Sequence, residues 1–271
     1  MMSRKLSLAL FGAAGLLTLS ACKNDPPPAQ PAAPAPTPTA AAKEPEKAPA
    51  APAAPAAPVG GRGTVKGVVK FNGEAPALAE VAPSADPACE GMSLKDQSVL
   101  VKDGKLANVL VRVRGPVAGA AAAPSEPVVI DQQKCTYLPR VQGAMAGQSI
   151  MVKNSDGTMH NVRGLAGTKG LFNLAQPPSA PPVTKPVPGE VEVLTLKCDV
   201  HPWMRAYVPV SPHPYFATTA EDGSFSLANV PEGTYTLEAW HESLGTKTAE
   251  ITVKEGAAAE ASFEFSATDK G

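Results

Sequence analysis

The sequence predicts an all-β protein in which two small β-sandwiches follow a long disordered tether. Three observations lead to this prediction. Short runs of alternating apolar residues recur along residues 63–271, glycine and proline separate these runs, and no amphipathic helical stretch of useful length interrupts them. Period-two runs at regular spacing between turn residues are typical of β-sandwiches. A stretch of about 200 residues suits two such domains better than one.

The first residues have the features of an export signal. Arg4 and Lys5 precede an apolar run over residues 6–19, which is too short to cross a bilayer with room to spare. The run ends in small residues before Cys22 (sequence LSAC), which resembles the bacterial lipobox. That resemblance implies a signal peptide over residues 1–21, cleavage before Cys22 and a diacylglycerol on its sulfur. The alternatives are a secretory peptide cut elsewhere and an uncleaved anchor.

The location of the mature protein follows from this signal. Lys23 stands where an aspartate would favour retention in the inner membrane of some Gram-negative bacteria. We therefore expect a lipid-anchored protein of the cell envelope, held at the periplasmic side of the outer membrane rather than the inner membrane. The net charge of −1 gives no reason to expect nucleic acid as a partner.

Residues 22–62 consist mainly of alanine and proline with a few charges. Such a composition has too little to bury to offset the entropy of ordering, so the segment is expected to be disordered and extended. At about 3 Å per residue it would reach on the order of 100 Å. We interpret it as a tether, and a proline-rich recognition motif is the alternative.

The folded part divides into three segments. Apolar alternation predicts strands over residues 64–71, 108–113, 150–153, 192–198, 204–210, 225–227, 235–239, 251–253 and 263–265. We assign residues 63–124 to an N-terminal β extension, residues 125–210 to one sandwich and residues 211–271 to a second.

A turn motif characterises the last segment. Asp222-Gly223 is a hairpin-type turn followed by alternating Phe225 and Leu227, and Pro231-Glu232-Gly233 then turns the chain into Tyr235 and Leu237. This run of about fifty residues resembles the carboxypeptidase regulatory-like, transthyretin-like sandwich. The resemblance implies a packing module without catalytic residues of its own.

The segment 198–204 contains a cysteine, a histidine and a methionine within seven residues. Thiolate and thioether sulfurs are soft ligands that favour copper, and imidazole suits copper as well. Cys198, His201 and Met204 can therefore bind one metal ion from a single tight loop. His160 is the candidate for a fourth ligand, because it follows an apolar strand, lies 198 − 160 = 38 residues before the cysteine, and is in phase with the apolar Val162.

Here the sequence resembles the Greek-key cupredoxins, the small blue copper proteins, and most closely the amicyanins. The likeness consists of His-Asn-Val at 160–162, Cys-x-x-His-Pro-aromatic-Met at 198–204 and the approach over residues 141–154. It covers roughly residues 125–210. The resemblance implies one type 1 copper ion with Cys198, His160 and His201 in a trigonal plane and Met204 as the long axial ligand.

The same resemblance implies roles for three neighbours of the ligands. Asn161 would brace the ligand loop by hydrogen bonds across it. His201 would form a partly exposed apolar face with Pro202 and Trp203, through which electrons enter and leave.

Other metal chemistry fits the residues less well. Zinc bound by the cysteine and the two histidines is the rival, but methionine is a poor zinc ligand. Attached haem is disfavoured because the chain has no Cys-x-x-Cys-His sequence.

Two cysteines remain when Cys22 and Cys198 are set aside. Outside the cytosol a spare pair tends to oxidise, and we expect a disulfide between Cys89 and Cys135. It would close a loop of 135 − 89 = 46 residues and contribute about 4 kcal/mol on the chain-entropy model. Two free buried thiols are the alternative.

The function we expect is that of a membrane-tethered one-electron carrier, not an enzyme, because only four histidines are available and further copper centres need more. The alternatives are a copper-binding or delivery lipoprotein without redox turnover and a structural interaction module. The expected partners are envelope redox proteins, and an acidic one is suggested by the basic residues Arg163, Lys169, Lys197 and Arg205, set against Asp156 and Asp199. His213 and His241 are interpreted as satisfied histidines, and a second metal site between them is the alternative.

Overall fold

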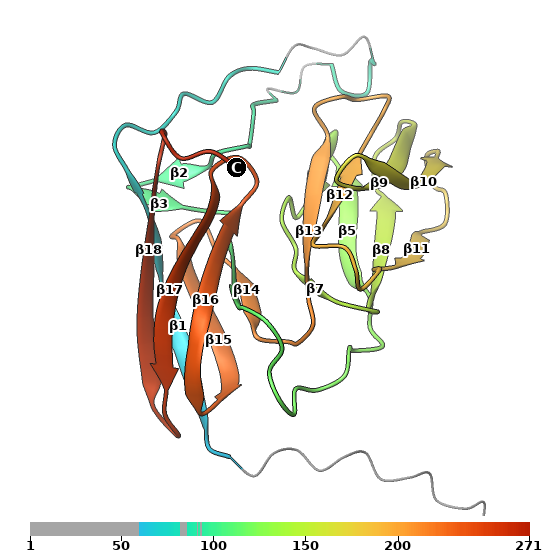
Figure 1. Cartoon of the computed structure of the whole chain (residues 1–271). Helices are drawn as coiled ribbons and strands as arrows, with labels where there is room; N and C mark the ends of the chain where they lie inside the picture. Colours follow the sequence, from blue (N-terminus) through green and yellow to red (C-terminus); the bar gives the residue numbers. More distant parts are fainter. Residues whose placement is uncertain (1–59, 82–85, 91, 93) are drawn as a thin grey trace, which may run out of the picture. The chain divides into compact units, whose positions relative to one another are not determined.

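The computed structural model of the chain describes residues 60–81, 86–90, 92 and 94–271 (Figure 1). Every regular element in this part is a β-strand, which confirms the predicted all-β class. Accordingly, no helix in the described ranges is long and apolar enough to cross a membrane. The predicted signal peptide, the lipidation residue Cys22 and nearly all of the tether lie outside the described residues.

The first sandwich comprises the strands between residues 128 and 211. One of its sheets has the order β10-β9-β12-β13-β7, with β10 at Lys169–Gln176, β9 at His160–Ala166, β12 at Val193–Lys197, β13 at Arg205–Ser211 and β7 at Ala144–Met145. The other has the order β11-β8-β5-β6, with β11 at Val183–Pro186, β8 at Ser149–Asn154, β5 at Val128–Gln133 and β6 at Thr136–Leu138. Their inward-facing apolar residues form one core, which includes Cys198 and Met204 at its edge.

The second sandwich also has two sheets. One runs β15-β1-β3-β2 with β18 added beside β1, where β15 spans Ser224–Pro231, β1 Arg62–Asn72, β3 Lys105–Leu106, β2 Val101–Lys102 and β18 Ala258–Ser266. The other runs β14-β4-β16-β17, where β14 spans Phe216–Thr218, β4 Leu110–Val113, β16 Gly233–His241 and β17 Gly245–Val253. Buried apolar side chains and Tyr215 form its core, and the partly buried Tyr235 packs against it.

The structure corrects the predicted domain boundaries. Residues 63–124 are not an extension of the first sandwich, because β1 pairs with β15 and β18 and β4 pairs with β14 and β16. Figure 1 shows β1, coloured cyan, among the orange and red strands of the last segment. The first sandwich is thus inserted between β4 and β14 of the second.

The pairing of β1 has a physical cause that local alternation does not reveal. Val65, Val69 and Phe71 are all buried in the core of the second sandwich, and the parallel partner strand β18 supplies Phe263 and Phe265 to the same core. Gly67 permits the close approach of the two strands, since a Cβ at this position would lie 1.6 Å from the carbonyl oxygen of Ala261.

Charged side chains join the two sandwiches. Nη2 of Arg140 donates a 2.8 Å hydrogen bond to Glu242, whose side chain is only 3% exposed. Arg112 donates through Nη1 to the carbonyl oxygen of Val210 at 2.7 Å and through Nε to Glu238 at 2.8 Å. Buried charges are tolerated where they are paired and hydrogen-bonded. These contacts therefore determine how the two sandwiches meet.

Candidate metal centre

The loop between β12 and β13 contributes three candidate ligands. Cys198 follows the last residue of β12, and Met204 directly precedes β13. The loop closes on itself, because the backbone N–H of Cys198 donates to the carbonyl oxygen of Met204 at 3.3 Å and that of Met204 donates to His201 at 2.9 Å. All three side chains are buried, with exposures of 2%, 1% and 0% for Cys198, Met204 and His201.

His160 is the first residue of β9, which lies beside β12 in the sheet. The turn before it is fixed by Asn154, whose side-chain amide donates to the carbonyl oxygens of Thr158 and Gln176 at 2.9 Å each. Antiparallel pairing with β12 then places the start of β9 next to the start of the 198–204 loop. His160 is fully buried there.

Three donor atoms converge at this point. Nδ1 of His160 lies 2.9 Å from Nδ1 of His201, and the Sγ of Cys198 lies 4.0 Å and 3.8 Å from these two nitrogens. In complexes of zinc with the same donor types, metal–nitrogen and metal–sulfur bonds are about 2.0–2.3 Å. Two donor atoms that bind the same ion can be separated by at most the sum of their two bond lengths to it. All three separations are within this limit.

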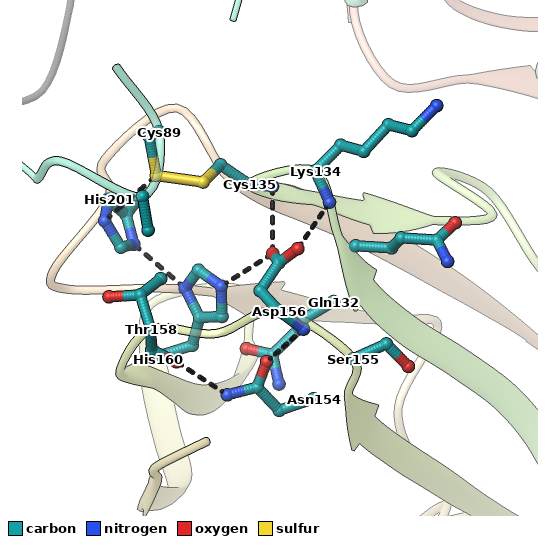
Figure 2. A network of polar contacts seen from close by, with 12 residues as sticks. Cys89, Gln132, Lys134, Cys135, Asn154, Ser155, Asp156, Thr158, His160 and His201 are labelled. Carbon is teal, nitrogen blue, oxygen red and sulfur yellow. Dashed lines mark hydrogen bonds and ion pairs between the residues drawn. A yellow bond between two sulfur atoms is a disulfide. The ribbon is translucent and has the colours of Figure 1, made fainter. Parts of the chain in front are cut away.

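The distal nitrogens of both histidines face carboxylates. Nε2 of His160 lies 2.9 Å from Oδ2 of Asp156, and Nε2 of His201 lies 3.1 Å from Oδ2 of Asp86. Figure 2 shows the two rings turned toward each other, with Asp156 behind His160. A carboxylate can only accept, so each Nε2 carries the proton and each Nδ1 presents a lone pair. Two lone pairs 2.9 Å apart and facing a thiol repel each other, which is the arrangement that a bound cation relieves.

The electrostatics of the pocket favour neutral imidazole. Burial lowers the pKa of His160, and the hydrogen bond to Asp156 opposes this shift without cancelling it. Metal ligation requires the neutral ring. Thus the position of His160 keeps it ready to bind an ion rather than a proton.

Asn161 connects the strand of one histidine with the ligand loop. Its side-chain oxygen accepts a 2.6 Å hydrogen bond from the backbone N–H of Asp199 and a 3.4 Å contact from the thiol of Cys198. Its own backbone N–H points at the same sulfur from 3.5 Å. These are the bonds across the loop that the sequence resemblance implied for this residue. Hydrogen bonds to a ligating sulfur tune a copper thiolate.

Tyr137 supports the strands that carry the donors, a role that no sequence motif indicates. Its side chain is 1% exposed, and its hydroxyl donates to the carbonyl oxygens of Asn161 at 2.9 Å and Lys197 at 3.3 Å. Burial raises the pKa of this phenol, so it remains protonated and serves as a donor. Tyr137 thereby ties β9 to the end of β12.

The structure corrects the expected exposure of His201. We had expected its ring to form a partly exposed face with Pro202 and Trp203, but His201 is 0% exposed. Residues 86–90 cover it, with Cys89 Sγ 3.6 Å from its Nε2. Pro202 and Trp203 instead line a neighbouring cavity of about 480 Å³. The Trp203 ring lies 5.1 Å from that of His201 and donates its indole N–H to the carbonyl oxygen of Cys135 at 2.8 Å.

The predicted partner cysteines lie beside the donors. Cys89 and Cys135 are joined by a disulfide, and Cys198 is the free cysteine among the described residues. Asp86 belongs to the same small loop as Cys89 and was missed by sequence reasoning, because it stands more than a hundred residues from His201 and belongs to no motif. In the sequence, the one indication that Asp86 lies near the donors was its position three residues before Cys89.

The other two histidines take no part in this centre. His213 accepts the backbone N–H of Tyr215 at 3.3 Å, and His241 accepts those of Ser243 and Leu244 at 3.2 Å each. Each side chain is therefore turned onto its own local backbone. The metal-ligand clusters found in the described part of the chain include neither of them.

Two acidic residues near the ligand loop are engaged in local contacts. Asp199 pairs with Arg163 at 3.3 Å, and hydrogen bonds to Asn173 and Arg163 contribute to a lowered pKa of Asp199 although burial opposes the shift. Asp156 faces inward, where it accepts the backbone N–H groups of Lys134 at 2.6 Å and Cys135 at 2.9 Å.

Comparison with known proteins adds two kinds of similarity. The family described as polysaccharide lyase family 4, domain II, matches residues 191–261, which include the ligand loop and much of the second sandwich. This is a different β family from the one that the turn motif resembles. No curated protein matches the chain.

Solved structures of small copper proteins are similar to part of the chain. The novel purple cupredoxin from Nitrosopumilus maritimus is 23% identical over 31% of this chain and 99% of its own, with a TM-score of 0.28. Amicyanin from Paracoccus versutus (Thiobacillus versutus) is 25% identical over 37% of this chain and 97% of its own, with a TM-score of 0.29.

The donors in the structure fit a copper ion. His160, Cys198 and His201 bring two imidazole nitrogens and a soft sulfur within 4.8 Å of one another in a buried pocket, and the thioether of Met204 is buried in the same core. This geometry confirms the predicted convergence of His160, Cys198 and His201 in a type 1-like His-Cys-His set within a β-sandwich. The last segment forms part of a second β-sandwich, to which strands between residues 62 and 113 also belong.

Proposed function

We propose that this chain is a one-electron carrier of the cell envelope, tethered to a membrane by a lipid on Cys22. The observation that carries the redox part is the convergence of two imidazole nitrogens and one thiol at 2.9–4.0 Å in a buried pocket. Copper, when bound, supplies a one-electron couple between Cu(II) and Cu(I). A soft thiolate with two imidazoles is the donor set used for such electron transfer.

The residues around the donor atoms hold them in fixed positions. The ligand loop is closed by its own backbone bonds, Asn161 braces it from β9, and Tyr137 ties the two strands together. Ligands that hardly move require little rearrangement when the charge on the ion changes. Delivery of copper to another protein would instead need accessible ligands, and both histidines are 0% exposed.

The route for the electron is proposed through Trp203. Because His201 is covered, the aromatic ring 5.1 Å from it is the side chain that leads from the centre to the adjoining cavity. Lys95 and Arg205 line this cavity together with Glu80 and Glu242, so the lining does not by itself select the charge of a redox partner.

The test of this function is the visible spectrum of the copper-loaded protein together with its voltammetry. We expect an intense thiolate-to-Cu(II) absorption, a reversible one-electron wave and retention of copper against a competing chelator. Cys198→Ser should abolish the absorption, while the thermal unfolding of the metal-free variant stays close to that of the wild type. Absence of the band would refute the copper site. Rapid loss of copper with sluggish electron exchange would instead favour delivery.

The membrane tether is supported by the sequence of residues 1–62 and is tested separately. Two or more acyl chains anchor a protein stably, since each buried methylene contributes about 0.8 kcal/mol. The wild type should therefore fractionate with membranes and Cys22→Ser should be released as a soluble form. Membrane fractionation of the variant equal to that of the wild type would contradict lipid anchoring.

A further inference from the structure

A small loop closes the metal centre on the side of His201. Asp86 Oδ2 lies 3.1 Å and Cys89 Sγ 3.6 Å from Nε2 of this histidine, whose side chain is 0% exposed. Residues 86–90 form this cap. They belong to neither sheet of the first sandwich, so the cap is an addition to the ligand scaffold rather than part of it.

Asp86 is held in place from two directions. Within the cap, its Oδ1 accepts the backbone N–H of Ala88 at 2.9 Å. From the turn before His160, the hydroxyl of Thr158 donates to its Oδ2 at 2.6 Å. The carboxylate therefore faces His201 in an orientation set by the cap and by the turn that carries the other ligand.

The disulfide connects the cap to the opposite histidine. Cys89 of the cap is bonded to Cys135, whose backbone N–H donates to Asp156 at 2.9 Å, and Asp156 in turn lies 2.9 Å from Nε2 of His160. Figure 2 shows this sequence of contacts, with the yellow sulfur–sulfur bond between the two halves. Each ligand histidine thus has one carboxylate, and the disulfide joins the segments that position the two.

We propose that Asp86 is a positioning residue of the metal centre, held against His201 by the Cys89–Cys135 disulfide. It fixes the tautomer of His201 in which the Nδ1 lone pair faces Cys198, and it raises the donor strength of the ring. Carboxylates on the distal nitrogen act in this way on metal-bound histidines. A stronger nitrogen donor stabilises Cu(II) more than Cu(I), because the more highly charged ion gains more from it. This inference rests on the proposed copper site.

The test compares Asp86→Ala and Asp86→Asn with the control Asp96→Asn. Asp96 is an exposed carboxylate that accepts the backbone N–H of Ser98 at 2.7 Å, so the control removes the same charge without touching a ligand. Cu(II) affinity, Cu(I) affinity, reduction potential and metal-free thermal unfolding are measured for each protein.

We expect Asp86→Ala to lower Cu(II) affinity about 10–100-fold, with a smaller loss for Cu(I). The reduction potential should rise by about 59 mV for each tenfold by which the Cu(II) loss exceeds the Cu(I) loss. Asp86→Asn should change the Cu(II) affinity and the reduction potential in the same directions but by less, because its amide oxygen can still accept a hydrogen bond from His201. Affinities equal to those of Asp96→Asn would overturn the proposal, as would equal losses for the two oxidation states.

The role of the disulfide is tested by the double variant Cys89→Ala with Cys135→Ala, made alone and combined with Asp86→Ala. If the disulfide acts by holding Asp86, the losses of Cu(II) affinity are not additive, and the triple variant binds about as tightly as Asp86→Ala. Full additivity would show that the disulfide does not act through Asp86. Should the cysteine variants not fold, the Asp86 pair still decides the role of the carboxylate.

The outcomes separate this inference from the proposed function. Wild-type protein without a thiolate-to-copper band disproves the copper site itself. A wild type with that band, together with Asp86 variants that behave like the control, leaves the carrier intact and removes only the role of the cap.

Discussion

The first sandwich buries two histidines, the second sandwich with the segment leading into it buries two others, and the two pairs use their ring nitrogens differently. In the first, His160 and His201 turn their Nδ1 atoms toward each other and toward the thiol of Cys198. In the second sandwich and the segment leading into it, the Nδ1 atoms of His241 and His213 accept backbone N–H groups of the residues that follow them. All four side chains are essentially inaccessible to solvent.

The comparison shows that burial does not distinguish a metal ligand from a structural histidine. What differs is how the two ring nitrogens are used: Nε2 faces a carboxylate in His160 and His201, whereas Nδ1 accepts backbone N–H groups in His213 and His241. A carboxylate behind the ring forces the remaining lone pair toward the pocket, whereas a backbone N–H uses that lone pair up. A buried histidine whose second nitrogen faces a carboxylate is therefore the better candidate for a ligand.

The largest expected effect tests whether the two sandwiches are separable in function. Leu196→Ala and Leu237→Ala each remove a fully buried leucine, one from each core, and each should lower the free energy of unfolding by about 2–5 kcal/mol in denaturant titrations. Only Leu196→Ala should shift the copper absorption, because Leu196 lies two residues before Cys198 on the same face of β12. A shifted band in Leu237→Ala would show that the second sandwich shapes the centre.

A smaller effect concerns the pH dependence of the second sandwich. Burial lowers the pKa of His241 to about 4, against about 6.5 in an unfolded chain. Between these values the unfolded state binds a proton that the folded state does not, so stability falls as the pH falls from about 6.5 to about 4. The loss from this group is at most about 3 kcal/mol.

His241→Asn should remove that part of the slope, since an asparagine oxygen can accept the same backbone N–H groups without titrating. The difference between the free energies of unfolding of wild type and variant, measured from pH 7 to pH 4, isolates the contribution of His241. Parallel pH profiles would mean that the pKa of His241 in the folded state is close to that in an unfolded chain, so that its titration does not affect stability.

Much of the centre could be predicted because its ligands are coded locally. Cys198, His201 and Met204 lie in one loop, and the phase of the flanking strands determines which way they point. His160 could be predicted as well, because an antiparallel strand beside the one that ends at the loop brings its own first residue back to this loop. The exposure of His201 could not be predicted, because it depends on residues 86–90, whose position follows from long-range contacts and the disulfide.

The assignment of residues 63–124 was wrong for a related reason, whereas the strands of the first sandwich lie between residues 128 and 211, close to the predicted 125–210. Alternating apolar residues identify β1 as a strand, but they do not say which sheet it joins. Its neighbours β15 and β18 come about 150 or more residues later in the chain, and the buried phenylalanines of β18 with the close approach at Gly67 select that pairing.

By itself the sequence determined the all-β class, the export and tether segments as expectations, and the four donor types with their spacing, because these depend on period-two patterns and on residues close together in the chain. The tertiary structure decided the insertion of one sandwich into the other and the carboxylate of Asp86 behind His201. It also decided the burial of His201. Each of these arises from contacts between residues far apart in sequence, whose free energy is gained only when the whole core is assembled.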